Sequence, residues 1–387
     1  MTAIHVADVD VADVDVADVD VAGVDVAGVD VAVIGAGPAG AVAACLVARA
    51  GRSVLLLDPR VSDPASPKPG DALPGAALHV LHACALPLPS QNPVHRPIRG
   101  NISAWGTADA VHRDFLNEPD GSGWRLDRTV FESGLIDAAR DAGAVVSPSV
   151  FRGVTRDDGA WRLDLRNADA VAARWLVEAT GRRVAVARRL CAIRHRDEPL
   201  VAIVGYAQPD SRYVVERSMV ETAPLGWWYA ALLPDRRPVF MLHTRPAAAA
   251  RLRAAPDTWC AALAATRHIA AAFPDPVLDG PLRGYEACGA RLDPVQGEGW
   301  VACGDAALSF DPCAAQGLFA ALYSGMAVGR ALPSALGGDL TALREYAARC
   351  GEIRRIYRQR VRAYYADGER RWPDAEFWRA TGSTTGL

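Results

Sequence analysis

The sequence lacks the cysteine and histidine patterns that build metal sites and disulfide frameworks. Its eight cysteines are scattered, no two are spaced as CxxC, and no histidines cluster at the spacing of metal ligands. We therefore expect buried, reduced thiols and no bound metal.

Long hydrophobic runs are also missing. No window approaches the roughly 18 consecutive apolar residues of a membrane helix. The N-terminus is acidic where a secretory signal needs a basic start and an apolar core. No basic run interleaves with aromatic residues, which argues against nucleic-acid binding. The sequence predicts a cytoplasmic protein that neither crosses a membrane nor binds nucleic acid.

Positive charge is absent from the first 30 residues. They contain eight aspartates and no lysine or arginine, so the net charge of −3 leaves +5 on the remainder. From Val6 the chain repeats VADVD three times and VAGVD twice, a period of five that fits neither a helix nor a strand. We expect a disordered acidic extension over residues 1–30 and a folded domain from about Val31. Calcium binding is the weaker alternative, because the ligand spacing and turn glycines of calcium loops are missing.

The stretch from Val31 to Asp58 predicts a strand, a tight turn, a helix and a second strand. Its turn, GAGPAG, has the order G-x-G-x-x-G that is typical of dinucleotide-binding units. The candidate cofactor-binding residues in this turn are Gly35, Gly37, Pro38, Ala39 and Gly40. Pyrophosphate would lie at the helix N-terminus, and Asp58 stands where a ribose-binding acid is expected. A glycine-rich turn in an unrelated α/β protein is the weaker alternative, and this unit alone leaves FAD and NAD both open.

The rest of the chain alternates between α/β and strand-rich patterns. Helices are expected over 74–82, 128–142, 247–272, 317–332 and 340–380; strands are expected over 102–105, 111–115, 161–165, 174–178, 201–207, 213–218, 227–232, 239–243 and 300–303. These patterns predict a nucleotide-binding domain over 31–185 and 286–335, with part of 95–125 facing the substrate. They also predict a substrate domain over 186–285 and C-terminal helices over 336–387.

Four separated segments share one order with a known superfamily: GAGPAG (35–40), LDR (126–128), ATGR (179–182) and CGDAALSFDPCAAQG (303–317). Together they resemble the FAD-dependent oxidoreductases of the p-hydroxybenzoate hydroxylase and tryptophan halogenase superfamily. The resemblance implies an α/β fold with a Rossmann-like FAD-binding domain of the glutathione-reductase type, an inserted antiparallel β-sheet substrate domain and a C-terminal helical segment.

The resemblance also implies roles for individual residues. Gly304 and Asp305 would contact the ribityl or pyrophosphate part of FAD, and Arg128 would face the cofactor. The segment with Asp311, Pro312, Gln316 and Gly317 would lie beside the flavin ring; Pro312 and Gln316 are the catalytic candidates there. A helix N-terminus at Gly317 would stabilise negative charge on the reduced flavin.

A finer resemblance rests on KPGDALPGAA (68–77), SAWG (103–106), GWRLDR (123–128), GWWYAALLP (226–234) and RRWPDAEFW (370–378). These segments are similar to the halogenase-like flavoproteins that mature quinone cofactors in glycine and lysine oxidases. Such proteins are thought to hydroxylate a tryptophan of a precursor polypeptide. Halogenases use a lysine downstream of the block at 68–77, and this chain has none after Lys68. Trp227 and Tyr229 point to one side of a strand as candidates for a substrate wall, with plain core packing as the alternative.

The sequence therefore predicts an FAD-dependent monooxygenase that hydroxylates an aromatic ring, implied by the resemblance to be a tryptophan in a partner polypeptide. Electrons would come from NAD(P)H or from a separate flavin reductase. Alternatives are a flavin-dependent halogenase, an FAD-dependent reductase of a lipid or small metabolite, and a non-catalytic FAD-binding chaperone of a precursor protein.

Overall fold

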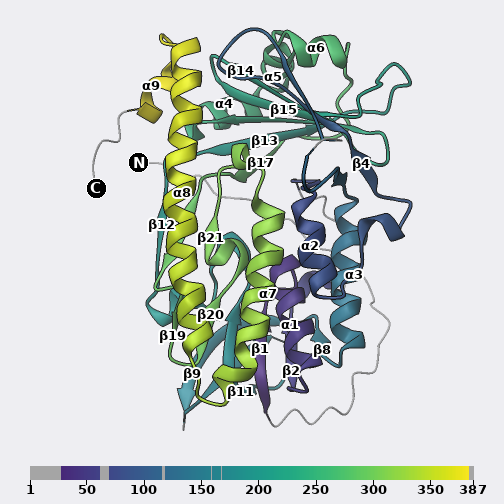
Figure 1. The fold of residues 1–387 in the computed structure, drawn as a ribbon. Helices are drawn as coiled ribbons and strands as arrows, with labels where there is room; N and C mark the ends of the chain where they lie inside the picture. The colour runs from purple at the N-terminus through teal and green to yellow at the C-terminus, as the bar shows by residue number, and fades with distance from the viewer. Residues whose placement is uncertain (1–27, 62–68, 116–117, 158, 167, 383–387) are drawn as a thin grey trace, which may run out of the picture.

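A mostly parallel sheet forms one half of the molecule (Figure 1). The computed structural model describes residues 28–61, 69–115, 118–157, 159–166 and 168–382. The main path of the sheet is β19-β20-β11-β1-β2-β8, with β10 and β9 attached beside β11. Its strands are β1 (Val29–Ile34), β2 (Val54–Leu57), β8 (Val145–Ser147), β9 (Val150–Asp157), β10 (Ala160–Arg166), β11 (Val171–Glu178), β19 (Gln296–Gly297) and β20 (Trp300–Ala302). The strands from β8 through β2, β1 and β11 to β20 pair in parallel, as the predicted dinucleotide-binding unit requires, and only β19 is antiparallel along this path.

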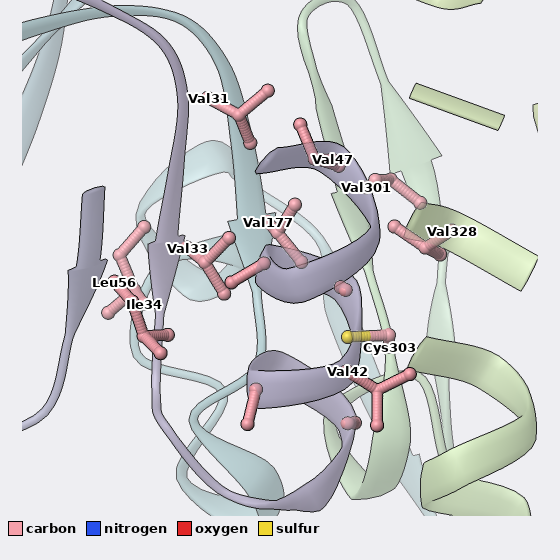
Figure 2. Packing of buried hydrophobic residues seen from close by; sticks show 14 of the residues in the cluster. Val31, Val33, Ile34, Val42, Val47, Leu56, Val177, Val301, Cys303 and Val328 are labelled. Atoms are coloured by element: carbon pink, nitrogen blue, oxygen red, sulfur yellow. The ribbon is translucent and has the colours of Figure 1, made fainter. Parts of the chain in front are cut away.

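Helices cover this sheet and bury its apolar strands. They are α1 (Pro38–Arg49), α2 (Ala76–Ala83), α3 (Arg128–Asp141) and α7 (Gly317–Leu336). Figure 2 shows valines of β1 and β11 packed against Val42 and Val47 of α1. Because β1 and β2 lie between covered faces, they are continuous apolar runs and do not alternate. Fully burying each such valine or leucine contributes about 1.5–3 kcal/mol.

The first strand begins two residues earlier than expected. Asp30 lies inside β1; its carboxylate accepts hydrogen bonds from the Ser53 backbone N–H (3.1 Å) and from Arg174 Nη1 (3.0 Å). Asp30 therefore belongs to the folded domain and not to the acidic extension. The expected disorder of the repeat falls on residues 1–27, outside the described residues.

A seven-stranded sheet forms the other half, in the order β17-β13-β16-β15-β14-β5-β6. Every pair is antiparallel except β14 with β5. The strands are β5 (Gly100–Ala104), β6 (Val111–Asp114), β13 (Val201–Tyr206), β14 (Ser218–Ala223), β15 (Gly226–Leu232), β16 (Pro238–Thr244) and β17 (Arg283–Glu286). Helices α4 (Pro246–Ala254), α5 (Pro256–Ala264) and α6 (His268–Ala272) cover its outer face (Figure 1).

Two expectations for this half are wrong in detail. The strand expected over 213–218 is not formed: Tyr213 packs on Phe273, Val214 is 83% exposed, and pairing starts only at Ser218. The single helix expected over 247–272 is three helices. Pro256 lacks an N–H and starts α5, and the buried Glu221 carboxylate accepts the backbone N–H groups at the start of α6.

Two small sheets and a long helix join the halves. The small sheets contain β3 (Ala72–Leu73), β7 (Gly123–Arg125) and β4 (Arg96–Ile98), and β12 (Ile193–Arg196), β18 (Ala290–Asp293) and β21 (Leu308–Ser309). Helix α8 (Thr341–Arg371), yellow in Figure 1, runs along the side of the molecule and is followed by α9 (Glu376–Gly382). Within the described residues, none of the helices has the length and apolarity needed to span a membrane.

Candidate functional site

The turn between β1 and α1 is open on one side. Gly35 has a φ of +107°, and a Cβ there would lie 2.2 Å from the Ala179 carbonyl oxygen, so only glycine fits. Gly37 precedes α1, and a Cβ on it would meet no protein atom within 4 Å. The start of α1 therefore leaves room for an anionic group near its N-terminus, where the helix dipole favours negative charge.

Three glycine-containing segments meet at this turn. Pro38, Ala39 and Gly40 form the first turn of α1, and Ala39 and Gly40 are buried. A Cβ on Gly304, in the turn after β20, would lie 2.8 Å from the Cβ of Ala39 and 4.0 Å from that of Ala321 in α7. The carboxyl ends of β1 and β20, the first turn of α1 and the part of α7 around Ala321 thus lie together, as is usual in open α/β sheets.

Asp58 stands at the end of β2 and is 5% exposed. Its carboxylate accepts four hydrogen bonds, one from the Ala36 backbone N–H (3.0 Å) and three from the backbone and guanidinium of Arg60. Burial opposes the charge of Asp58, but the bonds from Arg60 and Ala36 outweigh burial and lower the pKa of Asp58. A carboxylate has about four acceptor sites, and these four donors fill them. The predicted contact between Asp58 and a ribose therefore requires the half-exposed Arg60 to give up one of its hydrogen bonds to Asp58.

Asp305 lies in the turn after β20, with a side chain that is 35% exposed. Its carboxylate pairs with Arg182 Nε at 3.2 Å, and the other guanidinium nitrogens of Arg182 donate to the carbonyl oxygens of Cys288 (2.6 Å) and Phe310 (3.0 Å). Arg182 was noted only as part of the ATGR segment. The structure shows that it connects the Asp305 turn to the residues before Asp311.

The next segment contains a short 3-10 turn over Pro312–Ala314 and then the start of α7. Pro312, Gln316 and Gly317 are exposed, and a Cβ on Gly317 would meet no protein atom within 4 Å. These three residues are accessible to a bound ring, as their predicted roles require. Whether they contact one stays a prediction.

Asp311 differs from its prediction as a cofactor ligand. It is 7% exposed, and its carboxylate accepts hydrogen bonds from the Cys313 backbone N–H (2.9 Å) and the Tyr365 hydroxyl (2.6 Å). Burial raises the pKa of Asp311. The carboxylate is therefore used inside the protein, where it holds the turn, and the sequence pattern gave no sign of its partner on α8.

Arg128 starts α3 and holds the loop before β3. Its Nη1 donates to the carbonyl oxygens of Gly70 (2.5 Å) and Pro69 (3.2 Å), and its Nη2 pairs with Glu132. Its Nε is buried without a partner among the described residues. The unpaired Nε of Arg128 and the open space at Gly37 and Gly317 fit a polyanionic dinucleotide such as FAD.

A pocket of about 220 Å³ lies beside Arg128, between this loop and the inner face of the antiparallel sheet. Leu233, Val239 and Met241 give it an apolar wall. Tyr206 also lines it, and burial raises the pKa of this tyrosine to about 12, so it stays protonated near neutral pH. The sequence alone does not single out these four residues, because alternation along a strand does not show which part of a face is left uncovered.

The two aromatic candidates on β15 lie in different surroundings. The Tyr229 hydroxyl accepts a hydrogen bond from Arg125 Nη1 (2.5 Å), in a buried network that also includes Asp71 and Ser218. Trp227 is 1% exposed and stacks on His243, with ring centroids 3.6 Å apart. The prediction of a substrate wall is therefore wrong for Trp227, which packs in the core under α8 and α9.

The sequence of this chain is similar to those of known proteins. Residues 33–62 match the family described as an NAD(P)-binding Rossmann-like domain. LodB of Marinomonas mediterranea, named an FAD-dependent oxidoreductase, is 27% identical over 298 residues, which are 73% of this chain and 78% of LodB.

Three solved structures share the fold. The flavin-dependent halogenase CmlS is 21% identical, with a TM-score of 0.80 over 93% of this chain and 68% of its own. The myxobacterial chondrochloren halogenase CndH is 22% identical, with a TM-score of 0.80 over 92% of this chain and 86% of its own. QhpG, a peptidyl tryptophan dihydroxylase essential for tryptophylquinone cofactor biogenesis, is 23% identical, with a TM-score of 0.74 over 93% and 80%. The predicted resemblance, fold and cofactor are thus confirmed: this chain shares the fold of the flavin-dependent halogenases and is similar over 73% of its length to a protein named an FAD-dependent oxidoreductase.

Proposed function

We propose that this chain is an FAD-dependent monooxygenase that hydroxylates the ring of a tryptophan residue in a partner polypeptide, during maturation of a tryptophylquinone cofactor. One oxygen atom of O2 enters the ring in place of hydrogen, the other leaves as water, and two electrons come from NAD(P)H or from a separate flavin reductase. The similarity to QhpG supports this choice of substrate.

The pocket beside Arg128 is the observation that carries the proposal. Leu233, Val239 and Met241 offer an apolar surface to an aromatic side chain, and the pocket also borders Arg128, which the resemblance implies faces the cofactor. An aromatic ring held there is shielded from water on its sheet side. Excluding water protects reactive oxygen chemistry from side reactions.

FAD, when bound, supplies the oxygen activation, and the chain supplies position and environment. Gly37 and the start of α1 would hold the pyrophosphate, and Asp305 would accept hydrogen bonds from cofactor hydroxyls. The open N-terminus of α7 at Gly317 would stabilise negative charge on the reduced ring.

Halogenation is the main alternative. The only lysine of the chain is Lys68, which lies outside the described residues, and no lysine follows the block at 68–77, where halogenases use one. The sequence therefore lacks the downstream lysine of the halogenases, which favours hydroxylation.

The test is mass spectrometry of tryptophan-containing precursor polypeptides after turnover with reduced FAD and isotopically heavy O2, with and without chloride or bromide. We expect mass gains in steps of one oxygen that carry the heavy isotope and do not need halide. A halide-dependent mass gain would show a halogenase, and turnover without oxygen consumption would show a reductase. Equal precursor binding with and without flavin, and no product, would show a chaperone.

A pocket variant links the chemistry to the site. Val239→Phe should reduce product formation while FAD content is retained, because the larger ring fills the apolar wall. The same exchange at Val214, which is 83% exposed, is the matched control and should change neither.

A further inference from the structure

Two tyrosines of α8 reach the segment that borders the proposed flavin position. The Tyr365 hydroxyl donates to Asp311 Oδ2 at 2.6 Å, and the Asp311 backbone N–H donates to the Tyr357 hydroxyl at 2.8 Å. Tyr357 is 5% exposed and Tyr365 is 7% exposed. One residue of the segment is thus held through both its main chain and its side chain by a helix distant in sequence.

The held segment has a backbone that needs support. Asp311 caps the turn over Pro312–Ala314 by accepting from the Cys313 N–H, and Ala315 then takes a φ of +50° and a ψ of +30°. A left-handed conformation is unfavourable for a non-glycine residue, because its Cβ crowds the neighbouring carbonyl oxygen. The bonds from α8 offset this cost and fix the path of the chain into α7.

Tyr365 is also hydrogen-bonded to the antiparallel sheet. Trp227 Nε1 donates to the Tyr365 hydroxyl at 3.2 Å, within an aromatic cluster that includes Trp105 and Trp378. The hydroxyl of Tyr365 therefore lies between the antiparallel sheet and the turn over Pro312–Ala314, and its orientation is fixed from both sides.

We propose that Tyr357 and Tyr365 are positioning residues that set the conformation of the Asp311–Gly317 segment and, through it, the environment of the bound flavin ring. The proposal rests on FAD being held at this segment, and it does not depend on which substrate is oxidised. It assigns to α8 a role beyond packing.

The first measurement is amide hydrogen exchange of the FAD-free chain. Tyr365→Phe removes a hydrogen bond to a carboxylate, which is worth about 1.5–3 kcal/mol, so exchange of the Cys313 N–H should become about tenfold faster or more. Tyr213→Phe is the matched control, because its hydroxyl is also bonded to protein, to the Pro274 carbonyl oxygen at 3.2 Å in the other half of the molecule. That variant should leave exchange at Cys313 unchanged.

The second measurement is the reduction potential and the visible absorption spectrum of bound FAD. Both quantities should change in Tyr365→Phe and in Asp311→Asn. Neither should change in Tyr213→Phe. Because the two substitutions weaken the same bond, the double variant should change the potential by less than the sum of the single changes.

The outcomes separate this proposal from the proposed function. Unchanged exchange at Cys313, or faster exchange with an unchanged flavin potential and spectrum, would refute the positioning role whatever reaction the enzyme performs. A failure to hydroxylate tryptophan, with the exchange and potential shifted as expected, would overturn the proposed function and leave this inference standing.

Discussion

Removing one member of the buried ion pair between Asp71 and Arg125 tests how the two halves of the site are held together. The two side chains are 5% and 4% exposed, and Arg125 Nη1 lies 2.5 Å from Asp71 Oδ2. Arg125 in β7 also donates to the Tyr229 hydroxyl in β15 (2.5 Å) and to Ser218 Oγ in β14 (3.0 Å). One guanidinium thus connects the pocket loop to two strands of the antiparallel sheet.

In Asp71→Ala, Arg125 would remain charged. Burial works against its charge, but Tyr229 and Asp71 outweigh burial and raise the pKa of Arg125 above its ordinary value, which is itself far above neutral pH. Removing one partner of a buried pair leaves an uncompensated charge and costs about 3–5 kcal/mol. We expect this loss in the free energy of unfolding, measured by urea denaturation of the FAD-free chain.

Two further variants decide the cause of the loss. The double variant Asp71→Leu with Arg125→Met removes both charges and should recover most of the stability, although Tyr229 and Ser218 each lose a donor. Asp137→Ala breaks the ion pair between Asp137 and Arg140, in which both side chains are about half exposed. This change should lower the free energy of unfolding by less than about 1 kcal/mol. If Asp71→Ala costs no more than Asp137→Ala, Asp71 and Arg125 do not form a desolvated link between the two halves.

Three other changes have defined outcomes. Gly37→Val should abolish FAD binding, seen as a lost flavin absorbance ratio, with an unchanged melting temperature of the FAD-free chain, because the new side chain meets open space and not protein; a normal flavin content would contradict the site. Asp305→Ala should raise the FAD dissociation constant far more than Asp311→Ala, since the first carboxylate is partly exposed and the second is enclosed by protein; equal constants would overturn the assignment. Burial lowers the pKa of His243 from 6.5 to about 3, so below pH 6.5 the unfolded chain binds a proton that the folded chain does not. Stability should therefore fall by up to about 1.4 kcal/mol per pH unit on acidification, and His243→Phe should flatten the slope of the free energy of unfolding between pH 7 and pH 5; parallel slopes would show that His243 is not the group responsible.

The local parts of the nucleotide-binding half could be predicted from sequence, because their signals lie close together in the chain. The turn from Gly35 to Gly40 and the apolar runs on either side specify the strand, helix and strand without information from distant residues. The start at Val29 was missed because Asp30 reads as part of the acidic repeat. Only the folded chain brings Arg174 and Ser53 to its carboxylate.

The site residues show the same limit. Alternation along 227–232 predicts that Trp227 and Tyr229 share one side of the strand, but it does not show that α8 and α9 cover Trp227 there. The role of Asp311 depends on Tyr365, which is 54 residues later in the chain. Neither the covering of a face nor a contact of that range leaves a periodic signal in the sequence.

The order of the strands has a consequence for biogenesis. β20 pairs directly with β11, yet β13 to β17 of the antiparallel sheet are synthesised between them, and the two tyrosines that hold the Asp311 turn come later still. A nascent chain that has emerged only as far as β11 contains the glycine turn but lacks β20, α7 and α8. Domains fold as units during synthesis, so this flavin site can close only after translation has passed α8. Cofactor loading is thereby tied to synthesis of the chain through α8, and products truncated before α8 would be released without bound flavin.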